Sequence, residues 1–321
     1  MNGARDWMPA IGRDKLAARA NLLARLRAHF DARGLLEVQT PLLSRAGSPE
    51  LHIDSLAVPN AFPDGARGWL IPSPEFHLKR LLAAGCGEVY SVARVFRAGE
   101  TGRRHNPEFT LVEWYRIGFD LDALMRDIEA LLSSLLPAGL LARPAERVTY
   151  RDAFLRHARL DPFSASIEAL REAAGACNEE EDDRDTLLDR IGALVVYPRL
   201  GDGRLSMIHG FPASQASLAR IRPGDPPLAD RVEAIFSGVE LVNGFVELAD
   251  AGEQRRRFEA DLARRVGLGR EAAALDERFL AALQSGLPDC AGAALGFDRL
   301  AMLALGAASI ADVMAFPQDR A

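Results

Sequence analysis

The residues best suited to chemistry form a basic, glycine-containing segment at 96–109, which reads FRAGETGRRHNPEF. Arg97 stands where an expected strand ends, and a guanidinium can bind two phosphate oxygens at once. Gly99 and Gly102 permit a ligand to approach the backbone closely, because glycine has no side chain. The segment therefore indicates a hairpin loop that holds a phosphate group. An exposed basic turn without a ligand has the same composition, so composition alone leaves both interpretations open.

The strand expected after this loop carries an acid and a phenol at alternate positions. Side chains of a strand alternate between its two faces, so Glu113 and Tyr115 project to one side. Val112 and Trp114 project to the other side. A carboxylate beside a phenol suits an ammonium group, and a half-exposed strand without a ligand is the alternative.

A second group of acids lies in the segment ELVNGFVE, which begins at Glu240. Asn243 and Glu247 share one strand face, whereas Glu240 has the opposite parity. Glu240 joins them only if the strand contains a bulge, and Gly244 is the candidate for that bulge. Glu233 precedes the group. Carboxylates at these sites suit Mg²⁺, which prefers one or two carboxylates together with phosphate oxygens.

The segment ALGFDR, which begins at Ala294, joins an expected strand to an expected helix. Gly296 allows a nucleotide to lie close to the backbone. The guanidinium of Arg299 can stack on an adenine face. A glycine between a strand and a helix is common, so this segment is informative only in combination with the others.

Strands near both ends of the chain have to position these residues. The apolar spacing predicts an amphipathic helix over 13–33, and strands at 88–97 and 109–116 are predicted to form an antiparallel hairpin. A mostly helical segment, about 120–230, separates the two groups of strands. This order predicts an α+β fold with a mainly antiparallel sheet flanked by helices. The other expected elements are strands at 35–40, 69–72, 232–248 and 292–295, helices at 73–85, 250–266, 275–285 and 297–305, and a long loop or pair of short strands over 42–68.

The composition of the chain limits the classes of protein to which it can belong. With 48% hydrophobic and 26% charged residues it is typical of a globular protein, and no apolar run is long enough to span a membrane. The first ten residues lack the apolar core of a secretory signal. Cys86, Cys177 and Cys290 lie far apart without metal-binding spacing, so reduced thiols in the cytoplasm are expected.

The charge balance indicates no nucleic-acid partner. There are 39 Lys and Arg against 45 Asp and Glu, a formal net charge of −6. The basic run at 255–257 is expected to lie on a solvated helix face. The acidic stretch at 179–185 is expected to be a solvated helix end or loop.

Together these segments resemble the three signature motifs of class II aminoacyl-tRNA synthetases, and the lysyl branch in particular. Pro41, which follows Leu36-Glu37-Val38, is similar to motif 1, which builds the dimer interface in that family. Residues 97–109 resemble motif 2, and residues 296–299 resemble motif 3. The resemblance runs from about residue 13 to the end of the chain. It implies a class II synthetase-like catalytic domain over 13–321, with the mostly helical segment as an insertion.

The resemblance also implies residue roles. Arg97 and Arg299 match the catalytic arginines, and Glu233 and Glu240 match acids that bind Mg²⁺. Residues matching the ATP contacts are Arg97, Ala98, Gly99, His105, Asn106, Phe109, Glu240, Leu241, Gly296 and Arg299. Residues matching the lysine pocket are Ser73, Pro74, Glu75, Glu113, Tyr115, Asn243, Glu247 and Ala294.

The chain departs from lysyl-tRNA synthetases at three places. Gly99 stands where they have a glutamate, with Glu100 beside it, and Ala294 stands where they have a glycine. Only about one helix and one strand precede Pro41, which is too little for an anticodon-binding domain. No such domain, and no recognition of a tRNA anticodon, is therefore expected.

With these departures the chain is similar to a family of truncated lysyl-synthetase paralogues, the elongation factor P–(R)-β-lysine ligases. Residues 81–87, 105–116 and 287–290 carry this likeness, and Ala294 matches an alanine of that group. The likeness implies a cytoplasmic, homodimeric ligase. It implies that ATP activates (R)-β-lysine as an adenylate, and that the acyl group passes to a lysine ε-amine of elongation factor P.

Two other functions are compatible with parts of the pattern. A stand-alone lysyl-synthetase core would activate α-lysine for RNA or a small acceptor. A catalytically inactive paralogue would serve as a binding or regulatory subunit, and such a chain is expected to lose Arg97, Glu240 or Arg299. All three residues are present.

Overall fold

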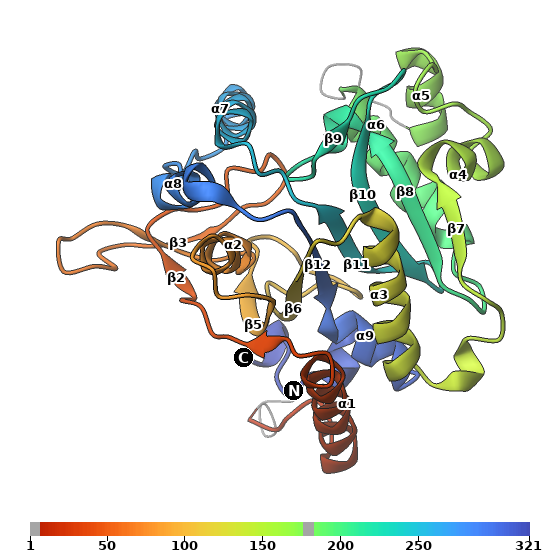
Figure 1. The fold of residues 1–321 in the computed structure, drawn as a ribbon. Coiled ribbons are helices and arrows are strands. Elements are labelled where there is room, and N and C mark those ends of the chain that lie inside the picture. Colours follow the sequence, from red (N-terminus) through yellow and green to blue (C-terminus); the bar gives the residue numbers. More distant parts are fainter. Residues whose placement is uncertain (1–6, 176–182) are drawn as a thin grey trace, which may run out of the picture. The chain divides into compact units, whose positions relative to one another are not determined.

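The structure is a computed structural model that describes residues 7–175 and 183–321. The chain forms two compact units, and each combines helices with strands (Figure 1). The first unit contains the chain up to Gly118 together with Ala249–Cys290 and Ala294–Ala321. The second unit contains Phe119–Leu248 and Ala291–Ala293. Most strand pairs in both units are antiparallel, so the predicted α+β class is confirmed.

The main strands of the first unit follow the order β1-β5-β6-β12. β5 and β6 form the predicted antiparallel hairpin, and β1 pairs with β5 in parallel. A small antiparallel sheet has the order β2-β4-β3, so the segment at 42–68 carries the predicted pair of short strands. The bounds are β1 Leu36–Glu37, β2 Leu43–Ser44, β3 Leu56–Val58, β4 Gly68–Leu70, β5 Val89–Phe96, β6 Glu108–Ile117 and β12 Cys290–Gly296.

Helix α1, Arg13–Asp31, packs against one face of the β5–β6 hairpin through Phe30. Phe30 stacks on Tyr90 with ring centroids 4.6 Å apart, and it lies 5.4 Å from Trp114. Tyr90 and Trp114 are register partners, so they lie on the same face of the sheet. Glu113 and Tyr115 consequently lie on the opposite face, as the alternation predicts.

The other helices of this unit are α2 Glu75–Ala83, α7 Ala251–Gly267, α8 Glu277–Gly286 and α9 Phe297–Ala304. Helix α2 begins one residue later than its capping pattern suggests, because Pro74 occupies the cap position. The hydroxyl of Ser73 still accepts a hydrogen bond from the N–H of Glu75 at 3.0 Å. The helix ends at Ala83, and Gly85 follows with φ +79°, as the predicted stop requires.

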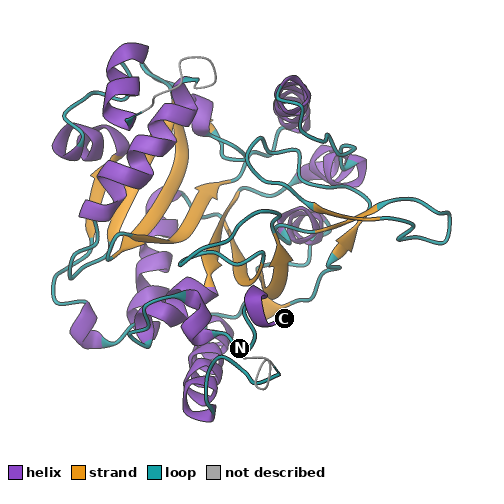
Figure 2. Cartoon of the chain, turned by 180° about the vertical axis from the view of Figure 1, so that it is seen from behind, coloured by secondary structure: helices purple, strands orange, loops and turns teal. Residues whose placement is uncertain are grey.

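The second unit has the strand order β11-β10-β8-β7, with β9 paired to β10. Helix α3 lies over one face of these strands, and α6 lies over the other, which Figure 2 shows from behind. The mostly helical segment therefore also supplies strands, of which β8 is buried except at His209. The bounds are α3 Leu121–Leu135, β7 Glu146–Thr149, α4 Tyr150–His157, α5 Ile167–Ala174, α6 Arg184–Ile191, β8 Ser206–Pro212, β9 Ile221–Arg222, β10 Leu228–Phe236 and β11 Val239–Val246.

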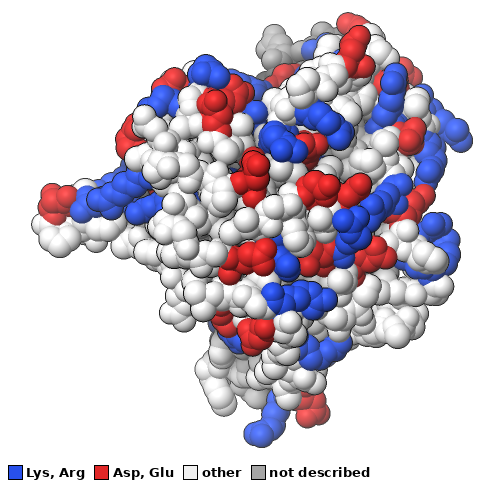
Figure 3. Space-filling model, in the orientation of Figure 1, with Lys and Arg blue, Asp and Glu red and all other residues white. Residues whose placement is uncertain are grey.

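Surface charges are mixed in sign. On the face drawn in Figure 3, basic and acidic side chains are interspersed. In the basic run of α7, Arg256 is exposed and pairs with Glu253 at 2.6 Å, whereas Arg255 and Arg257 are half-buried and pair with Glu277 at 2.5 Å and with Glu253 at 3.0 Å. The prediction of a solvated helix face therefore holds for Arg256 and only in part for its two neighbours. Of the acidic stretch, residues 179–182 lie outside the described residues, and Asp183 caps α6.

Two further expectations concern the described part of the chain. None of its helices combines the length and the apolar character that crossing a bilayer demands. Cys86 and Cys290 are free thiols, and Cys177 lies outside the described residues.

Candidate active site

The β5–β6 hairpin places Arg97 beside an aromatic ring. The N–H of Arg97 donates to the carbonyl of Pro107 at 2.8 Å, which closes the neck of the loop. Its guanidinium carbon lies 5.2 Å from the centroid of Phe109, and its Nη1 lies 3.5 Å from Glu100 Oε1. The hairpin thus presents a half-buried cation next to a flat apolar surface. This arrangement can hold a phosphate beside an aromatic base.

The two glycines of the loop serve its backbone shape. Gly99 has φ +75° and Gly102 has φ +146°, a range that residues with a side chain rarely adopt. The N–H of Ala98 donates to the carbonyl of Asp54 at 2.8 Å, so the first residue after Arg97 is fixed from outside the hairpin.

Helix α9 brings Arg299 to the same loop. Arg299 Nη2 lies 2.7 Å from His105 Nε2, and its Nε donates to the carbonyl of Arg104 at 3.3 Å. The preceding residue, Asp298, accepts a hydrogen bond from the N–H of Thr110 at 2.7 Å. The helix start and the strand that carries Phe109 are therefore held together, with Arg299 projecting toward the loop.

Asn106 supports the loop through both ends of its amide. Its Nδ2 donates to the carbonyl of Glu108 at 2.7 Å, and its Oδ1 accepts from the N–H of Gln318 at 3.0 Å. The side chain is buried. These bonds tie the loop to the C-terminal segment of the chain.

A buried cluster of acidic and hydroxyl side chains, named the acidic pocket, lies on the face of β6 away from α1. Glu113 is 3% exposed; its Oε1 accepts from the hydroxyl of Ser73 at 2.6 Å, and its Oε2 lies 3.4 Å from the hydroxyl of Tyr115. Burial, and next the charge of Glu75, raise the pKa of Glu113 to about 8. A positive group entering this pocket would favour the ionised carboxylate. The structure therefore brings Ser73, Glu75, Glu113 and Tyr115 together, as predicted.

Lys79 belongs to this pocket and was not predicted from the sequence. It is 1% exposed, and its Nζ lies 2.5 Å from Glu75 Oε1. The available signal was its position one helical turn after Glu75, which places the two side chains on one face of α2.

Ala294 lies on the same side of the hairpin. It packs with Phe109 against a buried apolar cluster of Ala93, Val95 and Leu111. Its methyl group thus belongs to the wall on which the aromatic ring rests.

In the second unit, the β10–β11 hairpin carries the other acids. Ala234 pairs with Val242, but Ile235 pairs with Glu240, so Leu241 is an extra residue in β11. The bulge turns Glu240 to the face of Glu233 and Asn243, which are themselves register partners. The predicted bulge exists, but its predicted position is wrong.

Gly244 has a packing role instead. A Cβ added there would lie 2.9 Å from Ala293 Cβ and 3.0 Å from the carbonyl of Gly292, so only glycine allows these segments to approach so closely. Regular pairing continues through Gly244, which sits opposite Val232.

Arg231 bonds to one side chain in β10 and one in β11, and no sequence motif indicated it. Its Nε donates to Asn243 Oδ1 at 3.1 Å, its Nη2 lies 2.5 Å from Glu233 Oε1, and its Nη1 donates to the carbonyl of Gln215 at 2.9 Å. Its guanidinium also lies over the ring of Phe211 at 4.5 Å. One cation therefore fixes two of the predicted site residues.

The acids of this unit differ in exposure. Glu233 and Glu247 are buried, whereas Glu240 is half-buried. Burial raises the pKa of Glu233 to about 7 against the lowering effect of Arg231. No cluster of three metal-ligating side chains occurs within residues 7–175 and 183–321. Glu233 and Glu240 lie on one face of the β10–β11 hairpin, and two carboxylates fit a Mg²⁺ ion that takes its other ligands from phosphates and water.

Comparison with known proteins identifies the family. The model of the class II tRNA synthetases (D, K and N) matches residues 6–320. The chain belongs to this family. The class II relationship confirms the prediction drawn from the three motifs.

Curated relatives align with this class II chain over its full length. A protein of Salmonella typhi is 46% identical over 329 residues, and proteins of Salmonella dublin and Salmonella paratyphi B are each 45% identical. Each alignment covers 100% of both chains. All three are named elongation factor P–(R)-beta-lysine ligase.

The two units of this class II chain hold separate parts of the predicted site. The first holds Ser73, Pro74, Glu75, Arg97, Ala98, Gly99, His105, Asn106, Phe109, Glu113, Tyr115, Ala294, Gly296 and Arg299. The second holds Glu233, Glu240, Leu241, Asn243 and Glu247. Convergence of Arg97 with Glu240 and Glu247 on one nucleotide and amino acid stays a prediction.

Proposed function

We propose that this chain activates (R)-β-lysine with ATP and transfers the β-lysyl group to a lysine ε-amine of elongation factor P. The observation that carries the proposal is the buried acidic pocket around Glu113, in the same unit as the Arg97 hairpin. Such a pocket favours a cationic amino acid, because a neutral one gives the buried carboxyl of Glu113 no added counter-charge. Relatives that align over the full length and carry the ligase name support this substrate and acceptor.

In the activation step, the carboxylate of the amino acid attacks the α-phosphorus of ATP, and diphosphate leaves. Negative charge builds on the α-phosphate during the attack, and the guanidinium of Arg97 stabilises it. Arg97 is held at its backbone by Pro107, so little reorganisation is needed. The product is a β-lysyl adenylate.

The adenine base is held between Phe109 and Arg299. The ring and the guanidinium supply two flat faces, and the bond between Asp298 and Thr110 connects the segments that carry them. His105, Asn106, Ala98, Gly99 and Gly296 complete this part of the ATP site. Asn106 acts by holding the loop, since both ends of its amide are bonded within the protein.

Acidic side chains recognise the amino groups of the substrate. Glu113, supported by Ser73 and Tyr115, binds one ammonium group. Asn243, in β11, and Glu247, the residue that follows β11, match the lysine pocket as well, and the bond from Arg231 orients Asn243. Ala294 places a methyl group where lysyl-tRNA synthetases have none, which adapts the pocket to a β-amino acid.

Glu240 and Glu233 would hold a Mg²⁺ ion. A bound Mg²⁺ would supply positive charge that neutralises the ATP phosphates. Glu240 is the more exposed of the two acids, because Glu233 is buried beside Arg231. The backbone of Leu241, at the bulge, adds an ATP contact.

In the transfer step, the ε-amine of the acceptor lysine attacks the carbonyl carbon of the adenylate. An amide bond forms, AMP leaves, and the amine proton is released to solvent. The adenylate is already activated, so correct positioning of the amine is sufficient. The chain acts in the cytoplasm as a homodimer built on the segment that ends at Pro41, without reading a tRNA anticodon.

Mass spectrometry of the acceptor tests the proposal. The protein is incubated with ATP, (R)-β-lysine and elongation factor P, and the acceptor is expected to gain the mass of one β-lysyl group. ATP–diphosphate exchange with α-lysine and with β-lysine identifies the preferred amino acid. No gain on the acceptor, combined with clear charging of tRNA, would overturn the proposal in favour of a synthetase core.

A further inference from the structure

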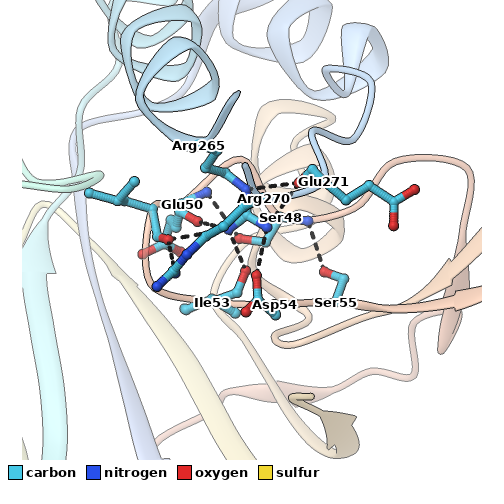
Figure 4. A network of polar contacts seen from close by, with 9 residues as sticks. Ser48, Glu50, Ile53, Asp54, Ser55, Arg265, Arg270 and Glu271 are labelled. Atoms are coloured by element: carbon cyan, nitrogen blue, oxygen red, sulfur yellow. Dashed lines mark hydrogen bonds and ion pairs between the residues drawn. The ribbon is translucent and has the colours of Figure 1, made fainter. Parts of the chain in front are cut away.

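Arg265, in the last turn of α7, lies outside all three motifs and is only 4% exposed. It is the centre of a polar network in the first unit (Figure 4). A guanidinium has five N–H donors in a rigid plane, and burying it is costly unless those donors find acceptors. The network shows which carbonyl and carboxylate oxygens accept hydrogen bonds from those donors.

The acceptors of Arg265 belong mainly to the loop that connects β2 to β3. Its Nη1 donates to the carbonyls of Glu50 at 2.7 Å and Ile53 at 3.1 Å. Its Nη2 lies 2.7 Å from Asp54 Oδ1, and its Nε donates to the carbonyl of Glu271 at 3.1 Å. This stretch of the loop contains no regular secondary structure, so these bonds replace the backbone pairing that a helix or strand would provide.

The clamped loop reaches both parts of the site in this unit. The carbonyl of Asp54 accepts the N–H of Ala98, the residue that follows Arg97. At its other end, Glu50 lines a cavity together with Ser73 and Glu75 of the acidic pocket. A shift of the loop would therefore move the backbone that carries Arg97.

We propose that Arg265 is a positioning residue for adenylate formation, acting through Asp54 and Ala98 on Arg97. The inference rests on the proposed function only in that Arg97 contacts the reacting phosphate. Lysine at position 265 would keep one charge but lose the planar fork, so it could not hold Glu50, Ile53 and Asp54 together. The guanidinium of Arg97 would then be displaced from the α-phosphate.

The test uses ATP–diphosphate exchange with whichever of α-lysine and β-lysine the unchanged protein activates. Failure of the proposed substrate or acceptor is thereby separated from failure of this inference. Arg265→Lys is expected to lower kcat by roughly 10- to 100-fold, the scale of a small misplacement of a reacting group. Asp54→Ala removes the carboxylate but keeps the carbonyl, and a smaller loss of kcat is expected.

A double-mutant cycle separates positioning from general damage to the fold. In an Arg97→Lys background, Arg265→Lys is expected to change the remaining kcat by less than about twofold, because its effect passes through Arg97. The same fold-loss in both backgrounds would overturn the proposal. Arg256→Ala, on the exposed face of the same helix, is the matched control and is expected to leave kcat unchanged.

Thermal unfolding of every variant accompanies the kinetics. If Arg265→Lys does not fold, Asp54→Ala in the two backgrounds provides the same cycle. The proposal would again be overturned if Asp54→Ala lowered kcat by the same factor in the unchanged protein and in the Arg97→Lys variant.

Discussion

Asp298, in the first turn of α9, accepts a hydrogen bond from the backbone N–H of Thr110 in β6 at 2.7 Å. Its other oxygen lies 2.6 Å from Arg19 Nη2, on helix α1. Three segments that are distant in the sequence thus meet at one buried carboxylate. Phe109 and Arg299, the residues adjacent to this pair, obtain their relative position from it.

Asp298→Asn is expected to destabilise the protein and to weaken ATP binding. The amide has nearly the same shape but leaves Arg19 without its counter-charge, and breaking a buried ion pair typically costs about 3 kcal/mol or more. Thermal unfolding and the KM for ATP in the exchange assay measure the two effects. A variant with unchanged stability and unchanged KM for ATP would show that the pair does not position Phe109 and Arg299.

Arg97→Ala and Arg299→Ala are each expected to abolish adenylate formation while the protein stays folded. Removing a fixed charge from a developing oxyanion commonly costs about 100- to 1,000-fold in rate, which is the expectation for Arg97. Exchange of diphosphate into ATP measures the first step without the acceptor. Near-normal exchange in either variant would contradict the assigned role.

Much of the first unit was predictable because its signals are local. The amphipathic spacing predicted α1, and alternation in β6 assigned Glu113 and Tyr115 to one face and Trp114 to the other. Glycines at positive φ mark the turns of the motif 2 loop. These features depend on a few neighbouring residues, which a sequence displays directly.

The features that were missed depend on pairs far apart in the chain. Arg231 bonds to Asn243, and Arg265 bonds to a loop more than two hundred positions earlier, so no local pattern marks either arginine as buried. The bulge was placed at Gly244 because glycine is common at bulges. The packing of Ala293 accounts for that glycine, and Leu241 carries the bulge.

Substrate affinity is expected to rise with pH up to about pH 8. The pKa of Glu113 is about 8, mainly because the carboxyl is buried. The side-chain ammonium of lysine has an ordinary pKa of about 10.4 and stays charged, so only ionisation of Glu113 limits pairing over this range. The KM for β-lysine between about pH 6 and pH 9 measures this effect. Glu113→Gln should raise KM above about pH 8, where Glu113 is ionised, and should leave KM nearly unchanged near pH 6, where Glu113 is already protonated, so the pH dependence is lost. A pH-independent KM in the unchanged protein would contradict the assignment.

The same carboxyl is expected to make stability fall as pH rises. The pKa of Glu113 is raised from its ordinary value of 4.5 to about 8 in the folded chain, so the folded state binds a proton that the unfolded state releases. This contribution is fully present below pH 4.5 and is lost as the pH passes through about 8. Thermal unfolding across this range should show a weaker decline for Glu113→Gln. An identical decline in both proteins would assign the effect to other groups.

Glu100, and not residue 99, is expected to supply the carboxylate next to Arg97. Gly99 has φ +75°, a conformation that costs a residue with a side chain about 1–2 kcal/mol, although the space around it is open. Gly99→Glu should therefore lower thermal stability slightly without raising kcat for exchange. Glu100→Ala should lower kcat, because it removes the acid 3.5 Å from Arg97 Nη1. An increase in kcat for Gly99→Glu, together with no loss for Glu100→Ala, would move the role to position 99.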